Sequence, residues 1–463
     1  MQYYIVLAIA TGIITFLGLL LWLKTKSLTF PFGLFFIYYL TLYGAWFVVY
    51  DKLGGDSGKH YAYLEEKMFR IYLDEYYLGA LIIYSVFVAV LAGTALLLVR
   101  TDKSRRTILP ENLKISHSPI VVICGCASIL SYLAIQEDLD ASVSQGVSAY
   151  VLLKRGFGDV SPWFTVHQIA LRLALVPTVI GLAVNFSGKF PRLFSCEPSK
   201  ISSFLYSLII GSMLMLAFVL GYKSEIFSAG LIGGLFYLMN VRKRKIVPGL
   251  VTAGAVLFGM WSVDRFRATS FDQLYEALFN GSFSSFGEIF SFATSSNEAF
   301  AGHFSMYGVL AADVPLTYGM SLLSFVASVV PRALWPDRPG DVYTYYANAV
   351  DAVSGQGYTI NHATAWYLNF GLIGVIAGAV LFGLIWAKCF NVCLRAATIN
   401  NRFLRVTASI APFTFTAYIP FLVRSGPESY KGLIIEAFLL PAIVLTLASF
   451  RWQFIPHIRR YIK

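Results

Sequence analysis

Residues 3–23 read YYIVLAIATGIITFLGLLLWL and contain no charged side chain. A helix of this length rises by about 30 Å, which matches the hydrocarbon thickness of a lipid bilayer. The run is continuous rather than alternating, so it predicts a membrane-spanning helix and not a barrel strand. Because no basic segment and cleavage site frame it, we expect a retained span rather than a removed signal peptide.

Similar apolar runs recur along the whole chain, of which 57% is hydrophobic and only 13% charged. So few charges cannot cover the surface of a soluble protein of 463 residues. We therefore expect an all-α, polytopic transmembrane helical bundle that forms a single integral membrane domain over 1–463. Further spans are expected near 28–50, 76–99, 119–136, 164–187, 202–221, 226–241, 246–263, 365–387, 406–423 and 431–450.

The apolar stretches 286–312 and 319–331 leave two alternatives open, because no basic residue marks the turn between them. A full hairpin would give about 13 spans, and a re-entrant pair would give about 11. Irregular membrane segments are tolerated only where they line a cavity or pack inside protein. Under either alternative, this region is expected to lie beside the functional chamber.

Lys and Arg are strongly biased toward alternate loops of the chain. The clusters around 24–26, 100–114, 189–200, 242–245, 388–405 and 451–463 hold 22 of the 36 basic residues but only three acidic ones. Short cytoplasmic loops carry this excess of positive charge. We expect the N-terminus to lie outside the cytoplasm and the C-terminus inside, with loops 264–285 and 332–364 on the outer side.

Several basic residues break this pattern at the outer ends of the expected spans. A single one is commonly a snorkelling anchor, but six at one depth favour a shared role. Guanidinium groups grip phosphate through paired, charge-assisted hydrogen bonds, so a ring of them suits a diphosphate head group on a lipid tail. The six residues are Lys223, Arg265, Arg267, Arg332, Arg338 and Arg424.

One histidine, His362, precedes an expected helix at its outer mouth, where it could act as a general base near neutral pH. A hydrogen-bonded histidine at the interface is the alternative. Asp337 and its acidic neighbours could hold a divalent ion with a diphosphate, but we favour charge compensation by the basic ring. The sequence therefore predicts no metal and no cofactor, and it contains no nucleotide-binding loop.

Three motifs in the C-terminal half resemble the bacterial O-antigen and oligosaccharide repeat-unit polymerases, the Wzy type. The first is the proline-rich loop Pro331-Arg332 with Leu334-Trp335-Pro336-Asp337-Arg338-Pro339. The second is His362 followed by Tyr367-Leu368-Asn369-Phe370-Gly371-Leu372-Ile373-Gly374, and the third is Arg424-Ser425-Gly426-Pro427-Glu428. Related O-antigen ligases also place a histidine before a similar Gly-Leu-Ile-Gly helix.

The resemblance implies a GT-C-like glycosyltransferase at the periplasmic face of the bacterial inner membrane, acting in lipopolysaccharide or related polysaccharide biosynthesis. It would transfer a growing glycan from undecaprenyl diphosphate onto a new undecaprenyl-diphosphate-linked repeat unit. By this analogy His362, Arg265 and Arg424 are catalytic, and the substrate-binding residues are Lys223, Arg267, Arg332, Arg338, Asp337, Tyr367 and Glu428.

The implied partners are the lipid-linked oligosaccharide and membrane lipids, with a chain-length regulator as a conceivable protein partner and no nucleic acid. An O-antigen ligase that uses lipid A-core as acceptor and a lipid-linked oligosaccharide flippase are the alternatives. The chain departs from the family where an acid often precedes the Tyr-Leu-Asn-Phe-Gly run, because Ala365 and Trp366 stand there. If that acid is catalytic, Glu428 or Asp337 must replace it.

Overall fold

The structure, a computed structural model, describes residues 1–54, 70–100, 113–136, 139, 162–187, 194–195, 199–240, 254–263, 292–293, 300–327, 330, 335, 339–340, 342–350 and 359–450. Nearly all of this part of the chain that has regular structure is helical. The exception is a two-residue parallel pair, in which β1 (Leu113–Lys114) lies beside β2 (Phe194–Ser195). The expectation of a helical bundle is confirmed at this level.

The N-terminal helices are α1 (Gln2–Thr25), α2 (Thr29–Tyr38), the π-helix η1 (Tyr39–Tyr43), α3 (Gly44–Gly54), α5 (Glu75–Leu98) and α6 (His117–Leu133). The middle of the chain forms α9 (Pro162–Ser187), α10 (Lys200–Val219), α11 (Lys223–Asn240), an apolar helix Gly254–Val263, α15 (Ala301–Ala311), α16 (Met320–Ala327) and α17 (Val342–Ala349). The C-terminal part forms α18 (His362–Leu394), η4 (Ala396–Thr398), α19 (Arg402–Val423), α20 (Ser429–Gly432), the π-helix η5 (Leu433–Leu439) and α21 (Leu440–Ser449).

Eight helices in the described residues are long and apolar enough to cross a membrane, which makes the chain a multi-pass membrane protein. They are Gln2–Thr25, Thr29–Gly54, Glu75–Leu98, Val166–Asn185, Lys200–Val219, His362–Leu394, Arg402–Val423 and Ser429–Ser449. The expectation of 11 to 13 spans refers to the whole chain, and parts of the expected spans 226–241, 246–263 and 286–331 lie outside the described residues. Helices α15 and α16 have 11 and 8 residues and adjoin residues outside that range, so the full hairpin and the re-entrant pair both stay predictions.

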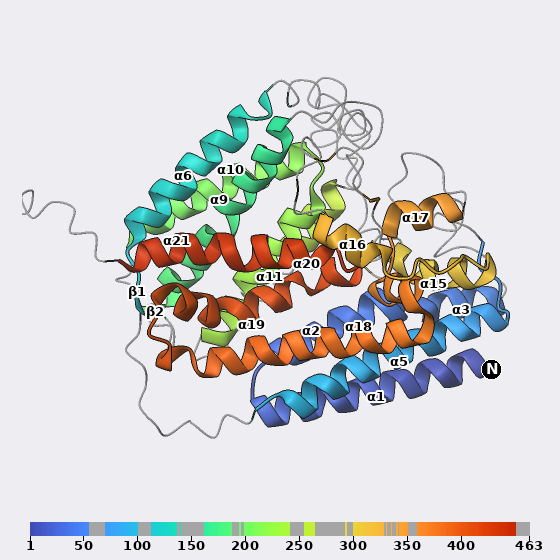
Figure 1. Cartoon of the computed structure of the whole chain (residues 1–463). Helices are drawn as coiled ribbons and strands as arrows, with labels where there is room; N and C mark the ends of the chain where they lie inside the picture. The colour runs from blue at the N-terminus through green and yellow to red at the C-terminus, as the bar shows by residue number, and fades with distance from the viewer. Residues whose placement is uncertain are drawn as a thin grey trace, which may run out of the picture.

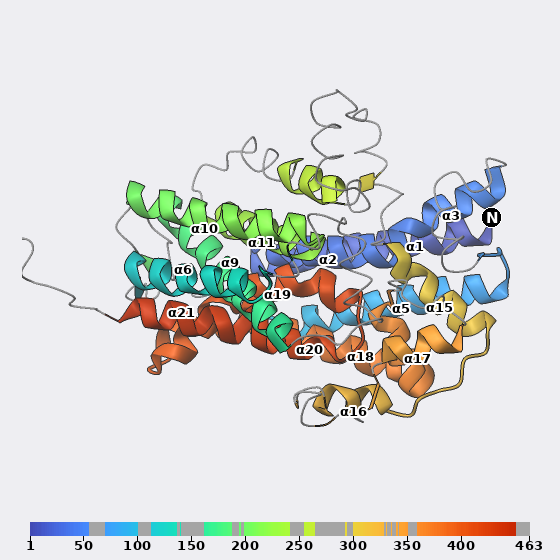
Figure 2. The ribbon, with the colours of Figure 1, turned by 90° about the horizontal axis from the view of Figure 1, so that it is seen from above.

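The helices pack as two groups that share α19. We call α1, α2, η1, α3, α5, α15 and α18 the first half-bundle, and α6, α9, α10, α11 and α21 the second half-bundle. Figure 1 shows the first group along the lower right and the second at the upper left, and Figure 2 shows the same division from above. One face of α19 buries Phe415 and Ile419 in the first core, and the other buries Ile410 and Phe413 in the second.

Helix α18 is broken near its start. Phe370 and Gly371 have non-helical backbone angles, with φ of +59° at Gly371, a conformation that glycine adopts with little strain. In an unbroken helix, His362 and Phe382 would lie about 30 Å apart, whereas their ring centroids are 5.7 Å apart. Residues 362–369 therefore form a short half-helix that folds back along the rest of α18.

Two glycines allow the short half-helix to pack tightly against the rest of α18. A Cβ at Gly374 would lie 2.1 Å from the carbonyl oxygen of Trp366, and one at Gly378 would lie 2.4 Å from the Trp366 ring. Gly374, the last residue of the motif 367–374, therefore has to be a glycine, because any side chain there would collide with the backbone of Trp366. The sequence prediction of one continuous span over 365–387 was wrong at this point, because hydropathy does not distinguish a helix from a helix that reverses on itself.

Candidate functional site

Five of the expected site residues lie outside the described residues. They are Arg265, Arg267, Arg332, Asp337 and Arg338. Loop 264–285 lies completely outside the described residues, and loop 332–364 does so at 332–334, 336–338, 341 and 351–358. The described residues from the expected set are Lys223, His362, Tyr367, Arg424 and Glu428, and the structure brings three of them together.

The turn after α19 joins two of the sequence motifs. Arg424 caps the C-terminus of α19, and its Nη2 donates a hydrogen bond to Oγ1 of Thr359 at 3.0 Å. Glu428 Oε1 accepts from the backbone N–H of Val342 at 2.9 Å. A Cβ at Gly426 would lie 2.3 Å from Glu428 Oε2 and 3.3 Å from Cβ of Ala365. Glu428 and Ala365 therefore both lie against Gly426.

His362 is fully buried at the start of the short half-helix. Its Nδ1 lies 2.8 Å from the carbonyl oxygen of Ser425, and its Nε2 lies 3.1 Å from Nε1 of Trp366 and 3.2 Å from the hydroxyl of Tyr430. Because a carbonyl only accepts, Nδ1 carries the proton and Nε2 accepts from the other two groups. We call His362, Trp366, Ser425 and Tyr430 the histidine cluster.

This geometry differs from the expected outer mouth of a helix. The His362 ring lies 6.1 Å from Phe87, the thirteenth residue of the 24-residue helix α5, so it is placed about halfway along that helix. The fold-back at Gly371 is the physical reason, because it carries the start of α18 inward. The hydrogen-bonding capacity of the imidazole is used by protein groups, which favours a role in holding the 424–430 turn against α18.

Lys223 and Tyr367 do not join the histidine cluster. Lys223 is the first residue of α11, after a turn in which the N–H of Tyr222 donates to the carbonyl of Ala217 and Gly221 has φ of +71°, a helix-ending geometry that favours glycine. Tyr367 is half-buried and packs between the first core and a smaller cluster around α17. Lys223 lies two residues before Glu225, whose carboxylate belongs to a second site.

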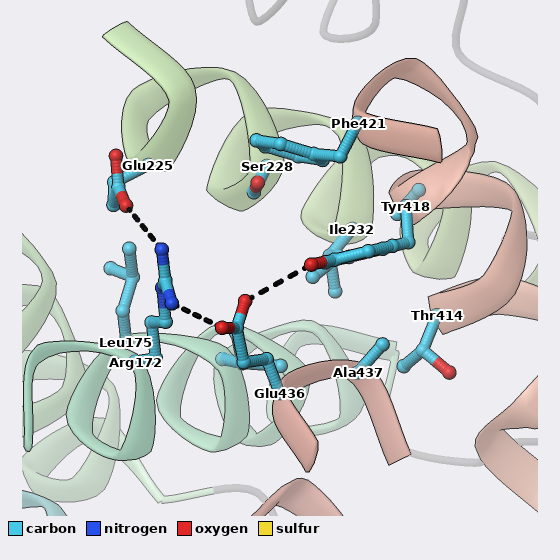
Figure 3. A pocket seen from close by; sticks show the side chains of 12 residues that line it. Arg172, Leu175, Glu225, Ser228, Ile232, Thr414, Tyr418, Phe421, Glu436 and Ala437 are labelled. Atoms are coloured by element: carbon cyan, nitrogen blue, oxygen red, sulfur yellow. Dashed lines mark hydrogen bonds and ion pairs between the residues drawn. The ribbon is translucent and has the colours of Figure 1, made fainter. Parts of the chain in front are cut away.

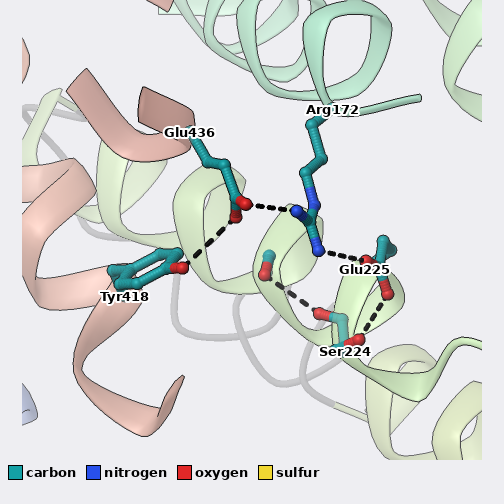
Figure 4. Close-up of polar contacts among 6 residues, drawn as sticks. Arg172, Ser224, Glu225, Tyr418 and Glu436 are labelled. Atoms are coloured by element: carbon teal, nitrogen blue, oxygen red, sulfur yellow. Dashed lines mark hydrogen bonds and ion pairs between the residues drawn. The ribbon is translucent and has the colours of Figure 1, made fainter. Parts of the chain in front are cut away.

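That second site is a pocket of about 110 Å³ between α9, α11, α19 and η5. Arg172 of α9 stands at its centre: Nη1 donates to Oε1 of Glu436, and Nη2 lies 3.4 Å from Oε1 of Glu225. The Tyr418 hydroxyl donates to Oε2 of Glu436 at 3.2 Å, and the Ser224 hydroxyl donates to Oε2 of Glu225. Figure 3 shows Arg172, Glu225, Tyr418 and Glu436 around the cavity, and Figure 4 shows the chain of contacts that also includes Ser224. We call this site the ion-pair pocket.

The ion-pair pocket lies within membrane-spanning segments. Arg172 and Glu436 belong to the spans Val166–Asn185 and Ser429–Ser449, where an ionised side chain without a partner is costly. Glu436 also lies in the middle of the π-helix η5, and π-helical turns inside α-helices are frequent at functional sites. Charge, cavity and backbone irregularity coincide here.

Sequence analysis missed Arg172 and Glu436. The available signal was their position inside apolar runs, since ionised residues within spans are rare and often functional. The expected site rested instead on basic residues at the outer ends of spans. The ion pair itself links residues 264 positions apart, which no local pattern reveals.

The chain was compared with protein-family models, with curated proteins and with solved structures, and none of the three comparisons gave a match.

Proposed function

We propose that the protein is a membrane glycosyltransferase that polymerises lipid-linked oligosaccharide repeat units. The observation that carries this proposal is the meeting of two motifs that resemble those of O-antigen polymerases. Ser425 and Tyr430, from the motif before the last span and its continuation, contact His362, which opens the other motif. Separate motifs that meet in space are expected when both contribute to one site.

Arg424 is the proposed ligand of a diphosphate leaving group. Fixed positive charge that stabilises a leaving group is usually the largest contribution to such a reaction. His362 is proposed to position the turn that carries Arg424, and Glu428 to replace the acid missing before Tyr367, because Glu428 and Ala365 both lie against Gly426. The outer loops 264–285 and 332–364 would supply the remaining guanidinium groups.

The proposal includes an orientation and a substrate. The Lys and Arg bias of the loops supports a cytoplasmic C-terminus and an active site on the periplasmic side of a bacterial inner membrane. The donor would be a glycan on undecaprenyl diphosphate, and the acceptor a repeat unit on the same carrier.

The test is complementation of a deletion strain, read on a polysaccharide gel. Deletion is expected to collapse the ladder of chain lengths to a single repeat, and Arg424→Ala is expected to do the same at unchanged protein level. The matched control is Arg402→Ala at the opposite end of α19, where the guanidinium contacts the carbonyl of Ser449. A normal ladder in the Arg424→Ala strain would remove this residue from the site.

An O-antigen ligase uses the same donor chemistry and is separated by the same gel. A ligase deletion leaves lipid A-core bare, whereas a polymerase deletion leaves core that carries one repeat. Bare core would therefore replace the polymerase by the ligase.

A lipid-linked oligosaccharide transporter is favoured by one specific observation. Arg172 and Glu436 lie inside spans and α18 is broken, and transporters share both features. A transporter deletion would leave unpolymerised repeat units on the cytoplasmic leaflet, which a membrane-impermeant glycosidase added to intact spheroplasts would fail to digest. Complete digestion would exclude this alternative.

A further inference from the structure

The ion-pair pocket has the contents of a ligand site rather than of a packed helix contact. Its lining combines the polar residues Arg172, Glu225, Ser228, Thr414, Tyr418 and Glu436 with aliphatic and aromatic side chains. A water needs roughly 10–15 Å³ of such volume, so the cavity of about 110 Å³ has room for a small group of waters or for one ligand comparable to a sugar ring.

The charges that line the pocket restrict the ligand. One guanidinium faces two carboxylates, so an anion that enters meets more negative than positive charge. Carboxylate oxygens are acceptors, and they match the hydroxyl or amine donors of a neutral or amino-bearing ligand. Phosphate and carboxylate ligands are disfavoured here.

The aromatic side chains restrict it further. Tyr418 and Phe421 stack with ring centroids 5.0 Å apart and planes at 29°, and both line the cavity (Figure 3). An aromatic wall opposite carboxylates and a guanidinium suits a ligand with one apolar C–H face and a rim of hydroxyl groups. A sugar ring has this combination.

The location of the pocket connects it with the histidine cluster. Tyr430 contacts His362, and Glu436 follows six residues later on the same stretch of α20 and η5, about 9 Å along a helical axis. The turns next to the pocket, at 221–223 and 424–428, are the ones that the charge bias places on the outer side.

We infer that the ion-pair pocket binds one sugar residue of the substrate, of the neutral or amino class and not of the uronic acid class. Glu225 and Glu436 accept hydrogen bonds from its hydroxyl or amine groups, Arg172 donates to its oxygens, and the Tyr418–Phe421 pair covers its apolar face. The statement that this sugar belongs to the substrate rests on the proposed function. The preference of the pocket for a neutral or amino sugar rests only on its lining residues.

The experiment places a reporter in the pocket and asks which glycoside protects it. Ser228→Cys is made in the full chain in lipid nanodiscs, and alkylation of residue 228 by a small maleimide is followed by site-resolved mass spectrometry. Methyl hexoside and methyl hexosaminide are expected to slow the alkylation about tenfold at ten times Kd, where ~90% of sites are occupied. Methyl hexuronide at equal concentration is expected to change it little. Tyr318→Cys, on the exposed turn after α15, should react equally with every additive.

A charge variant sharpens the assignment. In the Ser228→Cys background, Glu436→Gln keeps the shape of the side chain but removes a charged acceptor, and we expect at least about tenfold weaker protection. Glu75→Gln, at the exposed start of α5, is the matched control and should leave protection unchanged.

The outcomes separate this inference from the proposed function. Absence of protection by any glycoside, or equal protection by the hexuronide, overturns the inference while a collapsed ladder in the Arg424→Ala strain still supports polymerisation. Selective protection together with an intact ladder in the deletion strain keeps the sugar site and overturns the polymerase.

Discussion

The histidine cluster and the ion-pair pocket both include residues of the segment that runs from α19 through the 424–428 turn into α20 and η5, but they differ in charge and in surroundings. The histidine cluster faces the first half-bundle, is neutral, and has its imidazole nitrogens engaged by buried protein groups. The ion-pair pocket faces the second half-bundle, contains the three charged side chains Arg172, Glu225 and Glu436, and encloses an open volume. Buried nitrogens that are fully hydrogen-bonded to protein groups indicate a structural role, whereas charged side chains around a cavity are typical of a ligand site.

The largest predicted effect comes from Arg172→Ala. Removal of the guanidinium leaves Glu225 and Glu436 facing one another in a membrane-spanning bundle without their cation. Breaking a buried ion pair costs about 3–5 kcal/mol, and we expect about 3 kcal/mol here because the Arg172 side chain is 28% exposed. Unfolding of the purified protein in detergent, followed by intrinsic fluorescence, measures the loss of stability.

A compensated variant tests the cause of that loss. Arg172→Ala combined with Glu436→Gln removes one carboxylate together with the guanidinium and leaves only Glu225 charged, so it should recover part of the lost stability. Equal destabilisation by the single and the double variant would show that the charge balance is not responsible.

The second prediction concerns His362→Ala in the histidine cluster. The substitution leaves the buried Trp366 N–H and the buried Tyr430 hydroxyl without their acceptor, and each such group costs about 1–3 kcal/mol. We expect a total loss of about 2 kcal/mol, the lower end for two such groups, in the same unfolding assay. A variant of unchanged stability with abolished chain elongation would instead identify His362 as a general base and reverse the comparison between the two sites.

The sequence was sufficient for the class of fold. Apolar runs such as 3–23 predicted spans because the bilayer leaves helices few alternatives, and most of the C-terminal expectations correspond to observed helices. The reversal at Gly371 was not predictable from hydropathy, since its two arms are equally apolar. Gly374 was noted as part of a motif, but its contact with Trp366 depends on the folded path of the chain.

The two sites were also predictable only in part from sequence patterns. His362, Arg424 and Glu428 were selected from motifs, and the structure brings them into one region, although the burial of His362 depends on tertiary packing. Arg172 and Glu436 carried a usable signal as charges within spans. Their pairing did not, because α9 and η5 are distant in sequence and come together only in the tertiary structure.

The third prediction tests the fold-back that separates the two sites. Gly374→Ala places a methyl group 2.1 Å from a backbone carbonyl, which no side-chain rotation can relieve, and overpacking of this kind costs about 1–3 kcal/mol. Gly211→Ala in α10 is the control, because no atom lies within 4 Å of its added Cβ. It should be neutral or stabilise the helix by about 0.5–1 kcal/mol. Similar behaviour of the two variants would contradict the reversal at Gly371.

The smallest predicted effect compares two helix caps of the same kind. The Asn361 side chain accepts from the N–H of Ala363 at the start of α18, and the Asn401 side chain accepts from the N–H of Leu404 at the start of α19. Loss of an N-cap costs about 0.5–2 kcal/mol. Asn361 is buried and Asn401 is exposed, so water can replace only the second cap. We therefore expect Asn361→Ala to cost about 1.5 kcal/mol and Asn401→Ala about 0.5 kcal/mol. Equal losses in the two variants would mean that water reaches the start of the short half-helix, and the histidine cluster would then be as open as the ion-pair pocket.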